Sequence, residues 1–353
     1  MPTETYGKDY IRYGKDNLFP ETLFDFYNKC GLLRSILNTM LDYTAGSGFE
    51  STPDQPINKR GMLLSSLVKK CTLDYLIFGS FSIQVLRNQF GDVSELYWID
   101  QRQVRLNQEE TQVYWRKDWT GKTPNTNKKP FVYEANDNNA KNSIFVFKTP
   151  VSRNTYGSPV WEALYQEVQT LISIDNYNAN SVLNGFIPSA LINVVADEPD
   201  EDAKRRIKSQ FEDAFMGTEN AAGIVMVYSP DKEHFAEITP YAADQNSERY
   251  LNVLNTTQTS LYSGLRVPPI IVGTLAERTN FSAQEFKDAF ALTNATVISP
   301  MQREIETAFA SIKNIDGNSP FSFKLKSFEI DFGDTDGIPA NNNQTNESII
   351  DNA

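Results

Sequence analysis

The sequence predicts an α+β fold in which a mostly antiparallel sheet precedes two long helices. Short segments of alternating apolar and polar residues cluster before residue 150, as they do in half-buried strands. Two longer segments, at 158–185 and 246–266, repeat apolar residues at helical spacing. Between them lies a small insert with its own strand–helix–strand pattern.

The region 1–157 is expected to hold three helices and most of the sheet. Apolar residues recur at helical spacing near Leu23 and again between Leu33 and Leu41, and a further helix is expected at 63–75. Strands are expected at 78–86, 93–99, 104–106, 113–117 and 144–147. Residues 118–143 are rich in Asn, Lys, Thr and Asp, which indicates a loop or a hairpin.

The first long helix is predicted to begin at Ser158-Pro159, because serine caps helices and proline suits the first helical position. It should end at Gly185, since Pro188 prevents continuation. The insert then carries strands at 190–195, 223–228 and 235–239, with a helix after Pro199. An insert this small buries little surface, so we expect it to lean on neighbouring copies of itself.

The second long helix is predicted to stop at Pro268-Pro269. The next helix should start at Ser282, because Ser282-Ala283-Gln284-Glu285 matches a capping box. Pro300 should kink or break that helix. Residues 321–330 alternate as one more strand, and the polar tail at 333–353 is expected to be disordered.

Composition narrows the class of protein. The chain has 353 residues, of which 40% are hydrophobic and 22% charged, which is typical of a soluble globular protein. We find no apolar run of about 18 residues and no signal peptide, so no membrane association is expected. Cys30 and Cys71 are predicted to be buried thiols in a reducing compartment. A net charge of −12 argues against tight DNA binding but permits DNA to slide past.

No motif indicates a catalytic residue, a cofactor site or a metal site. The single histidine, His234, lacks a partner for a triad or a metal site and is expected in a surface loop. Gly46-Ser47-Gly48 fits a helix end, because no Gly-Lys-Ser/Thr follows it. The acidic residues between Asp197 and Asp202 fit no calcium loop and are expected at a solvated helix N-terminus.

Two segments have both an ordinary and a functional interpretation. The densest basic group is either a solvated helix face or a contact for an acidic partner or passing DNA; it comprises Lys204, Arg205, Arg206 and Lys208. The segment after the double proline is either a plain connection or a loop that projects into a lumen. Its candidate residues are Leu275, Ala276, Glu277, Arg278, Thr279 and Asn280.

Five local patterns, in this order, make the chain resemble the portal proteins of tailed bacteriophages and prophages whose capsids are like that of phage HK97. They are Tyr156-Gly157-Ser158-Pro159 before a helix; Asn-x-x-x-Asn-Gly-Phe-Ile-Pro at 180–188; Gly-Ile-Val-Met-Val at 223–227; Leu-Arg-Val-Pro-Pro-x-x-x-Gly at 265–273; and Asn-Phe-Ser-Ala-Gln-Glu at 280–285 followed by Ser-Pro-Met-Gln-Arg-Glu-Ile-Glu at 299–306. The resemblance covers about residues 15–330.

The resemblance implies a portal-type subunit in a homo-oligomeric ring, usually a dodecamer, at one vertex of the capsid. DNA would enter through the channel during packaging and leave through it at infection. A wing would comprise 1–157, a stem the helices at 158–185 and 246–266, and a clip 186–245. The tunnel loop, a kinked helix and a return to the wing would occupy 267–332. A crown would be reduced or absent, because little chain follows Pro320.

The implied partners are double-stranded DNA, the terminase large subunit, a head–tail adaptor, and the major capsid protein or scaffold. The basic group of the clip would contact these proteins, and residues 275–280 would face the DNA. The protein would act in the virion and assemble in the host cytoplasm, without a cofactor and without enzymatic activity. Two alternatives stay open: a structural adaptor of the virion that forms no ring, and a hydrolase that uses Asp or Glu.

Overall fold

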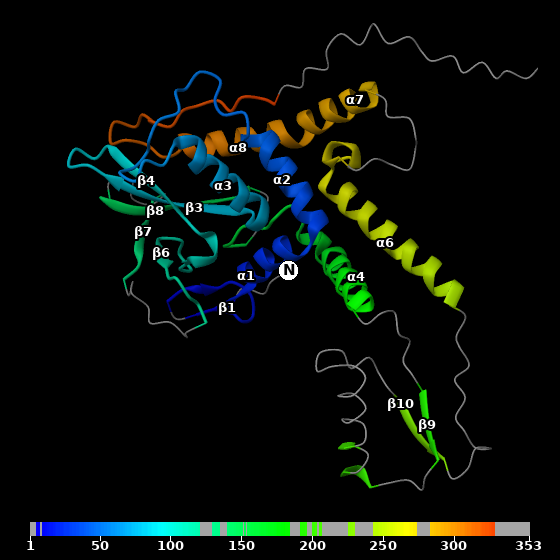
Figure 1. The fold of residues 1–353 in the computed structure, drawn as a ribbon. Helices are drawn as coiled ribbons and strands as arrows, with labels where there is room; N and C mark the ends of the chain where they lie inside the picture. The colour runs from blue at the N-terminus through cyan, green and yellow to red at the C-terminus, as the bar shows by residue number, and fades with distance from the viewer. Residues whose placement is uncertain are drawn as a thin grey trace, which may run out of the picture.

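A computed structural model describes residues 5–7, 9–120, 129–134, 140–150, 152, 154–183, 191–195, 200–202, 205–206, 225–229, 243–273 and 283–328. Its main body is a twisted sheet with helices against it, and two long helices, α4 and α6, extend from that body (Figure 1). The predicted mixture of helix and sheet is therefore confirmed.

The main sheet has six strands in the order β4-β3-β8-β7-β6-β5. Every neighbouring pair is antiparallel except β7 and β8, which are parallel. The strands are β3 (Ser80–Arg87), β4 (Val93–Ile99), β5 (Val104–Leu106), β6 (Gln112–Trp115), β7 (Phe131–Tyr133) and β8 (Asn142–Lys148). A separate short hairpin joins β1 (Thr5–Tyr6) to β2 (Ile11–Arg12).

Strand β7 was not predicted, because it lies in the stretch expected to be a loop or hairpin. Three residues are too few to show an alternating pattern, and polar residues flank them. Its neighbours supply the hydrogen bonds: Tyr133 donates its N–H to the carbonyl of Thr111 at 3.1 Å, and Glu134 donates to Ile144 at 3.0 Å. Tertiary pairing, and not local sequence, therefore creates this strand.

Three helices, α1 (Phe19–Lys29), α2 (Gly31–Ala45) and α3 (Leu64–Phe78), pack against one another, and α3 packs against β3. Their buried residues form the main apolar core together with side chains from β3 and the C-terminal helices. Burial of the apolar stripe on α2 confirms the helical periodicity read from the sequence. Cys30 and Cys71 belong to this core as free, buried thiols, which was also predicted.

The predicted helix start at Ser158-Pro159 is wrong. A 3₁₀ turn, η2 (Glu162–Leu164), precedes α4, which spans Tyr165–Leu183. Trp161 explains the delay: its side chain is fully buried, and its indole N–H donates to the carbonyl of Leu76 at 3.0 Å. The chain at 158–161 therefore packs against the end of α3 before a helix can begin.

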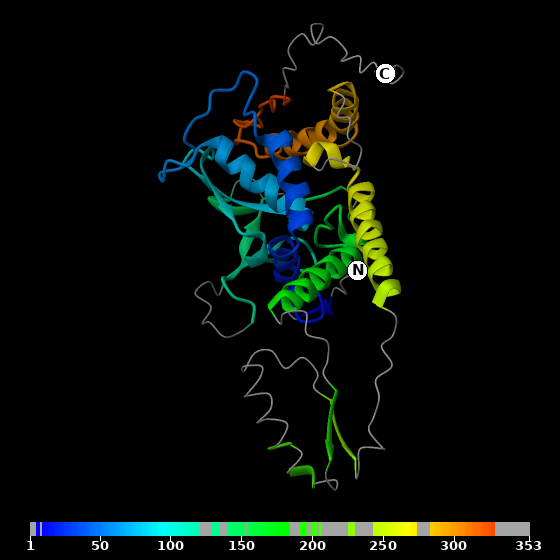
Figure 2. The same cartoon turned by 45° about the vertical axis from the view of Figure 1, so that its right-hand side comes forward.

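Helix α6 (Ala243–Leu265) packs beside α4, and the 3₁₀ turn η4 (Pro269–Val272) follows it directly (Figure 2). Next come α7 (Ala283–Thr293), a π-helical turn η5 (Asn294–Ile298) and α8 (Ser299–Ala310). The predicted break at Pro300 is confirmed, since the α-helical pattern is interrupted in the turn before it. Proline lacks the N–H that would bond four residues back, and widening the preceding turn accommodates its ring.

Two short strands belong to the insert. β9 (Leu191–Val195) and β10 (Val225–Ser229) pair in parallel, with Leu191 opposite Val225. Parallel neighbours require a crossover connection, which agrees with the predicted strand–helix–strand order. Residues 201–202 and 205–206 are helical between them. The third predicted strand, at 235–239, and His234 lie outside the described residues.

The strand predicted at 321–330 is reduced to a single antiparallel bridge between Phe49 and Leu325. The alternation itself is confirmed, because Phe323 and Leu325 are buried in the core while their neighbours are exposed. Residues 329–330 and the tail at 333–353 lie outside the described part of the chain. Among the helices that the structure describes, none is both long and apolar enough to cross a membrane.

Candidate channel and docking surfaces

The structure describes only part of the two sites predicted from sequence. Residues 275–280 of the candidate channel loop lie outside the described residues, as do Lys204 and Lys208 of the basic group. Arg205 and Arg206 are described, and both are exposed. The Arg206 guanidinium Nε donates to the carbonyl of Asp202 at 3.3 Å, one helical turn earlier.

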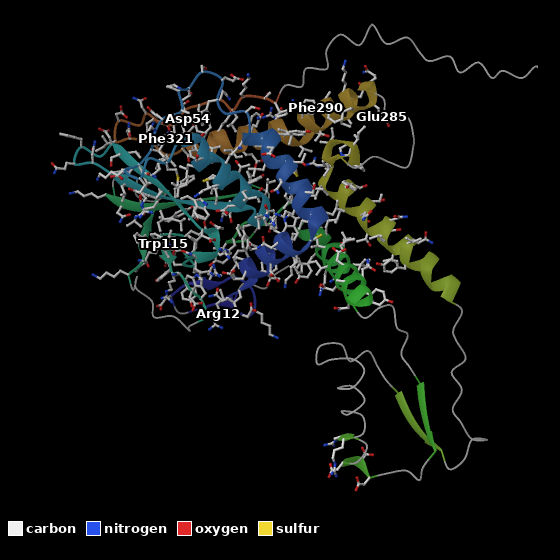
Figure 3. All side chains as sticks on the ribbon, viewed as in Figure 1. Arg12, Asp54, Trp115, Glu285, Phe290 and Phe321 are labelled. Carbon is white, nitrogen blue, oxygen red and sulfur yellow. The ribbon has the colours of Figure 1, made fainter. Side chains whose placement is uncertain are left out.

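Two described elements of the main body flank the candidate channel loop. Gly273, with φ of 87°, ends η4, and α7 begins at Ala283, the residue after the predicted Ser282 cap. Elements η4 and α7 contact each other. Glu285 lies on the first turn of α7, and Figure 3 shows α7 above the upper end of α6. The described residues on either side of 274–282 therefore lie on neighbouring elements, and the first of these elements follows the second long helix directly.

Helix α6 ends in a Schellman motif with an unusual residue at its centre. Arg266 has φ of 56°, in the left-handed region that favours glycine. Its N–H donates to the carbonyl of Ser263 at 3.1 Å, and the N–H of Val267 donates to Tyr262 at 3.1 Å. A non-glycine residue in this conformation costs roughly 1–2 kcal/mol. The motif turns the chain sharply into Pro268-Pro269.

An apolar groove of about 480 Å³ opens where α6 turns into η4 and faces α7. Leu292 lines it with 61% of its surface exposed, and the hydroxyl of Thr296 donates to the Leu292 carbonyl at 2.8 Å. Among the lining residues that the structure describes, Arg266 alone is charged. The described lining residues are Tyr262, Ser263, Arg266, Val267, Pro268, Pro269, Leu292 and Thr296. We call this surface the α6–α7 groove.

A second cavity of about 350 Å³ also has Arg266 in its lining and reaches Tyr75 and Glu304. The Tyr75 hydroxyl donates to Glu304 Oε2 at 2.8 Å, joining α3 to α8. Burial, together with this hydrogen bond to a carboxylate, raises the pKa of Tyr75, so the phenol stays neutral at any physiological pH. Glu304 makes no ion pair with Arg266. Within the described part of the chain, Arg266 therefore has no ion-pair partner.

The two long helices carry little charge that could hold a phosphate backbone. By sequence they contain Glu167, Asp175, Asp244 and Glu248 against a single base, Arg249. Tyr250 of α6 donates its hydroxyl to Asn178 of α4 at 2.7 Å, which fixes the pair near the lower end of α6. No group of three or more metal-binding side chains occurs in the part of the chain that the structure describes.

A sequence model of the family described as "Phage portal protein" matches residues 59–336. The chain belongs to the phage portal protein family. The match spans the sheet, both long helices, the insert and the kinked helix, which the motif order had indicated. No curated protein matches this portal chain closely enough to be informative.

Solved structures share the fold of this portal chain at low sequence identity. An HK97-family phage portal protein from Corynebacterium diphtheriae is 13% identical, with a TM-score of 0.55 over 86% of this chain and 95% of that one. A chain from the virion of a native gene transfer agent is 15% identical, with a TM-score of 0.53 over 87% and 82%. A chain from the neck of that particle, computed with C12 symmetry, is 15% identical, with a TM-score of 0.53 over 96% and 87%.

Sequence reasoning missed the α6–α7 groove. Its residues come from the end of one helix and the middle of another, so no local motif marks it. Arg266 offered the only signal: a helix stopped by Pro268-Pro269 needs a left-handed residue just before them, and arginine stands where glycine would fit without strain.

Proposed function

We propose that this portal chain assembles into a ring at one vertex of a phage or prophage capsid and conducts double-stranded DNA. The observation that carries the proposal is the family match over 59–336, together with two long helices packed side by side in its middle. A twelve-subunit ring is our expectation, supported by the C12 symmetry of the gene transfer agent neck. The ring would act in the virion and assemble in the host cytoplasm.

In this proposal α4 and α6 form the stem that surrounds the DNA. Affinity for duplex DNA rises with the number of phosphates that lysine and arginine neutralise. Helices with four acids and one base therefore suit a duplex that slides. The wing would comprise 1–157, with the return at 267–332, and would contact the major capsid protein or scaffold. Such a conduit has a structural role and needs no catalytic residues.

We assign residues 275–280 to a loop that touches the passing DNA. The support is the position of the flanking elements, since η4 follows the end of α6 directly and contacts α7. Glu277 and Arg278 nearly cancel in charge, which favours transient contact. Deletion of 276–279 should preserve ring assembly and alter DNA packaging or retention. Unchanged packaging by that deletion would overturn the loop assignment alone.

We assign the clip to 186–245 and propose that it docks the terminase large subunit during packaging and a head–tail adaptor afterwards. The exposed Arg205 and Arg206 support a contact there with acidic protein surfaces. Reversal of Lys204, Arg205 and Arg206 to Glu should weaken terminase docking more than subunit stability, because exposed charge changes cost a fold little. Normal packaging by the triple variant would support the other interpretation, in which these residues form a solvated helix face.

The decisive experiment is the particle size of the purified protein, alone and co-expressed with scaffold and capsid protein. Light scattering and electron microscopy should find a large ring with a central channel wide enough for duplex DNA. Only monomers or dimers, at every concentration and salt tested and with both partners present, would refute the ring and favour the non-ring adaptor.

A further inference from the structure

We propose that the tip of the β3–β4 hairpin in one copy of this chain inserts into the α6–α7 groove of the next copy. This inference rests on the proposed ring and names a contact that would build it. A closed ring requires a heterologous interface, in which two different patches of each subunit complement each other. The hairpin tip and the groove have the shape, the apolar surface and the charge to be such a pair.

The hairpin tip presents a large exposed aromatic side chain. Phe90 is 79% exposed, more than any other large hydrophobic residue that the structure describes. Ile315, 59% exposed, lies against Gly91 and widens the same apolar surface. We call Phe90 and Ile315, with Asp92 beside them, the hairpin knob. Aromatic residues are enriched among the anchors of protein interfaces.

The knob is held rigid before any contact forms. The side-chain oxygen of Asn88 accepts hydrogen bonds from the N–H of Phe90 at 2.8 Å and of Asp92 at 3.0 Å. Gly91, with φ of 89°, completes the turn, and a side chain there would collide with Ile315. A preorganised anchor loses little conformational freedom on binding, so more of its burial contributes to affinity.

Residues from distant parts of the chain brace the base of the hairpin. The buried guanidinium of Arg87 donates to the carbonyls of Gly91 at 3.0 Å and of Lys313 at 2.7 Å. The same side chain forms a buried ion pair with Glu134 of the sheet. Asn314 accepts from the N–H of Val93 at 2.9 Å. The hairpin therefore projects from the body as a fixed feature.

The groove offers the complementary surface. It is mainly apolar, about 480 Å³ in volume, and lined by prolines, Leu292 and Tyr262. A phosphate backbone would require clustered cations, but Arg266 is the single charged residue in the described part of this lining. An apolar protein segment that carries one acid suits this lining better.

Opposite charges on the two surfaces favour one orientation of the hairpin knob in the groove. Neither Asp92 nor Arg266 forms an ion pair with any residue that the structure describes. If Phe90 enters the groove, Asp92 lies two residues away and can meet Arg266 at its rim. The strained backbone of Arg266 is consistent with a residue kept for its side chain, since glycine would relieve that strain.

The positions of the two patches also suit a contact between neighbouring subunits of a ring. The β3–β4 hairpin and the junction of α6 with α7 lie on opposite sides of the body in both views (Figures 1 and 2). One copy cannot therefore fill its own groove with its own hairpin. Successive copies can join knob to groove until the ring closes.

The test uses two proteins, Phe90→Cys and Leu292→Cys, co-assembled into rings and treated with an oxidant or a short bifunctional thiol reagent. The native Cys30 and Cys71 are buried, so background reaction is small. We expect a crosslinked dimer from the mixture and none from either protein alone. Val132→Cys replaces Phe90→Cys as the control, because Val132 is an exposed apolar residue on another strand of the same sheet.

Charge reversal provides an independent readout. Asp92→Arg and Arg266→Glu should each weaken subunit association roughly tenfold or more, since like charges would then face each other. The double variant should restore association. Arg303→Glu, an exposed reversal on the neighbouring helix α8, should leave association unchanged.

The outcomes separate this inference from the proposed function. Rings that form without the Phe90–Leu292 crosslink would overturn the contact and leave the portal function standing. Protection of Leu292→Cys from a maleimide in those uncrosslinked rings would show that another segment fills the groove. Failure to form any ring, with scaffold and capsid protein present, would overturn both.

Discussion

Substitution of Gly157 by alanine should destabilise the subunit strongly. A Cβ at this position would lie 2.2 Å from the carbonyl oxygen of Gly79 and 2.8 Å from the Cβ of Ser80. Ordinary contacts begin near 3.4 Å, so the two backbone segments would have to separate by about 1 Å. Gly79 cannot yield easily, because it caps α3 with φ of 69° and its own Cα faces the backbone of Ser158.

The expected loss is about 3 kcal/mol, the upper end for overpacking in a core, because backbone and not a flexible side chain blocks the new methyl group. Two further contacts would suffer. The Tyr13 hydroxyl donates to the Gly157 carbonyl at 2.7 Å, and the rings of Tyr13 and Tyr156 stack with centroids 4.3 Å apart. A loss of this size is a large fraction of a typical domain's stability.

Urea unfolding followed by circular dichroism measures the change, with Gly31→Ala as the matched control. Gly31 has no atom within 4 Å of its would-be Cβ and lies at the start of α2 with negative φ, so alanine there should be neutral or slightly stabilising. Equal stability of the Gly157→Ala and Gly31→Ala proteins would refute the close-approach argument.

Three other substitutions test separate features. Arg266→Gly should raise the stability of the isolated subunit by about 0.5–1 kcal/mol in urea unfolding while weakening ring assembly; a loss of subunit stability would contradict the strain assigned to the helix cap. Glu134→Ala should cost about 3 kcal/mol, because it leaves the buried guanidinium of Arg87 unpaired, and the paired replacement Arg87→Met with Glu134→Leu should recover much of it. Burial raises the pKa of Asp74 despite a hydrogen bond from Trp98, so the folded state keeps a proton that the unfolded chain loses near pH 4, and stability falls as pH rises toward that raised pKa. Asp74→Asn should flatten this slope above about pH 4, and an unchanged slope would assign it to another group.

Much of the fold follows from local patterns. The helices α2 and α3, the strands β3 and β4 and the parallel pair of the insert all lie where apolar periodicity indicated them. The predictions from sequence fail where contacts between distant residues determine the local structure. Strand β7 exists because β6 and β8 leave a gap between them, and the start of α4 is delayed because Trp161 packs into the core first.

The candidate sites also fall into two groups, those that local patterns predicted and those that depend on the fold. The ordered motifs identified the family, which explains why the ring, channel and clip could be named from the sequence. The hairpin knob and the groove could not be predicted, because their proposed role depends on where the fold places two segments that are distant in the sequence. A phenylalanine in a turn at position 90 and an arginine at a helix end are unremarkable until the structure shows one exposed and the other lining a groove.

The π-helical turn at Asn294–Ile298 determines which length changes this region can tolerate. Such a turn holds one residue more than an α-helix needs to keep the flanking faces aligned. Loss of a single residue within it would leave a regular helix, with Phe286 and Phe309 still directed toward their present neighbours in the core. The same loss elsewhere in α7 or α8 would rotate one face by about 100° and expose an aromatic surface. Natural relatives that differ by one residue here should therefore carry the difference between 294 and 298.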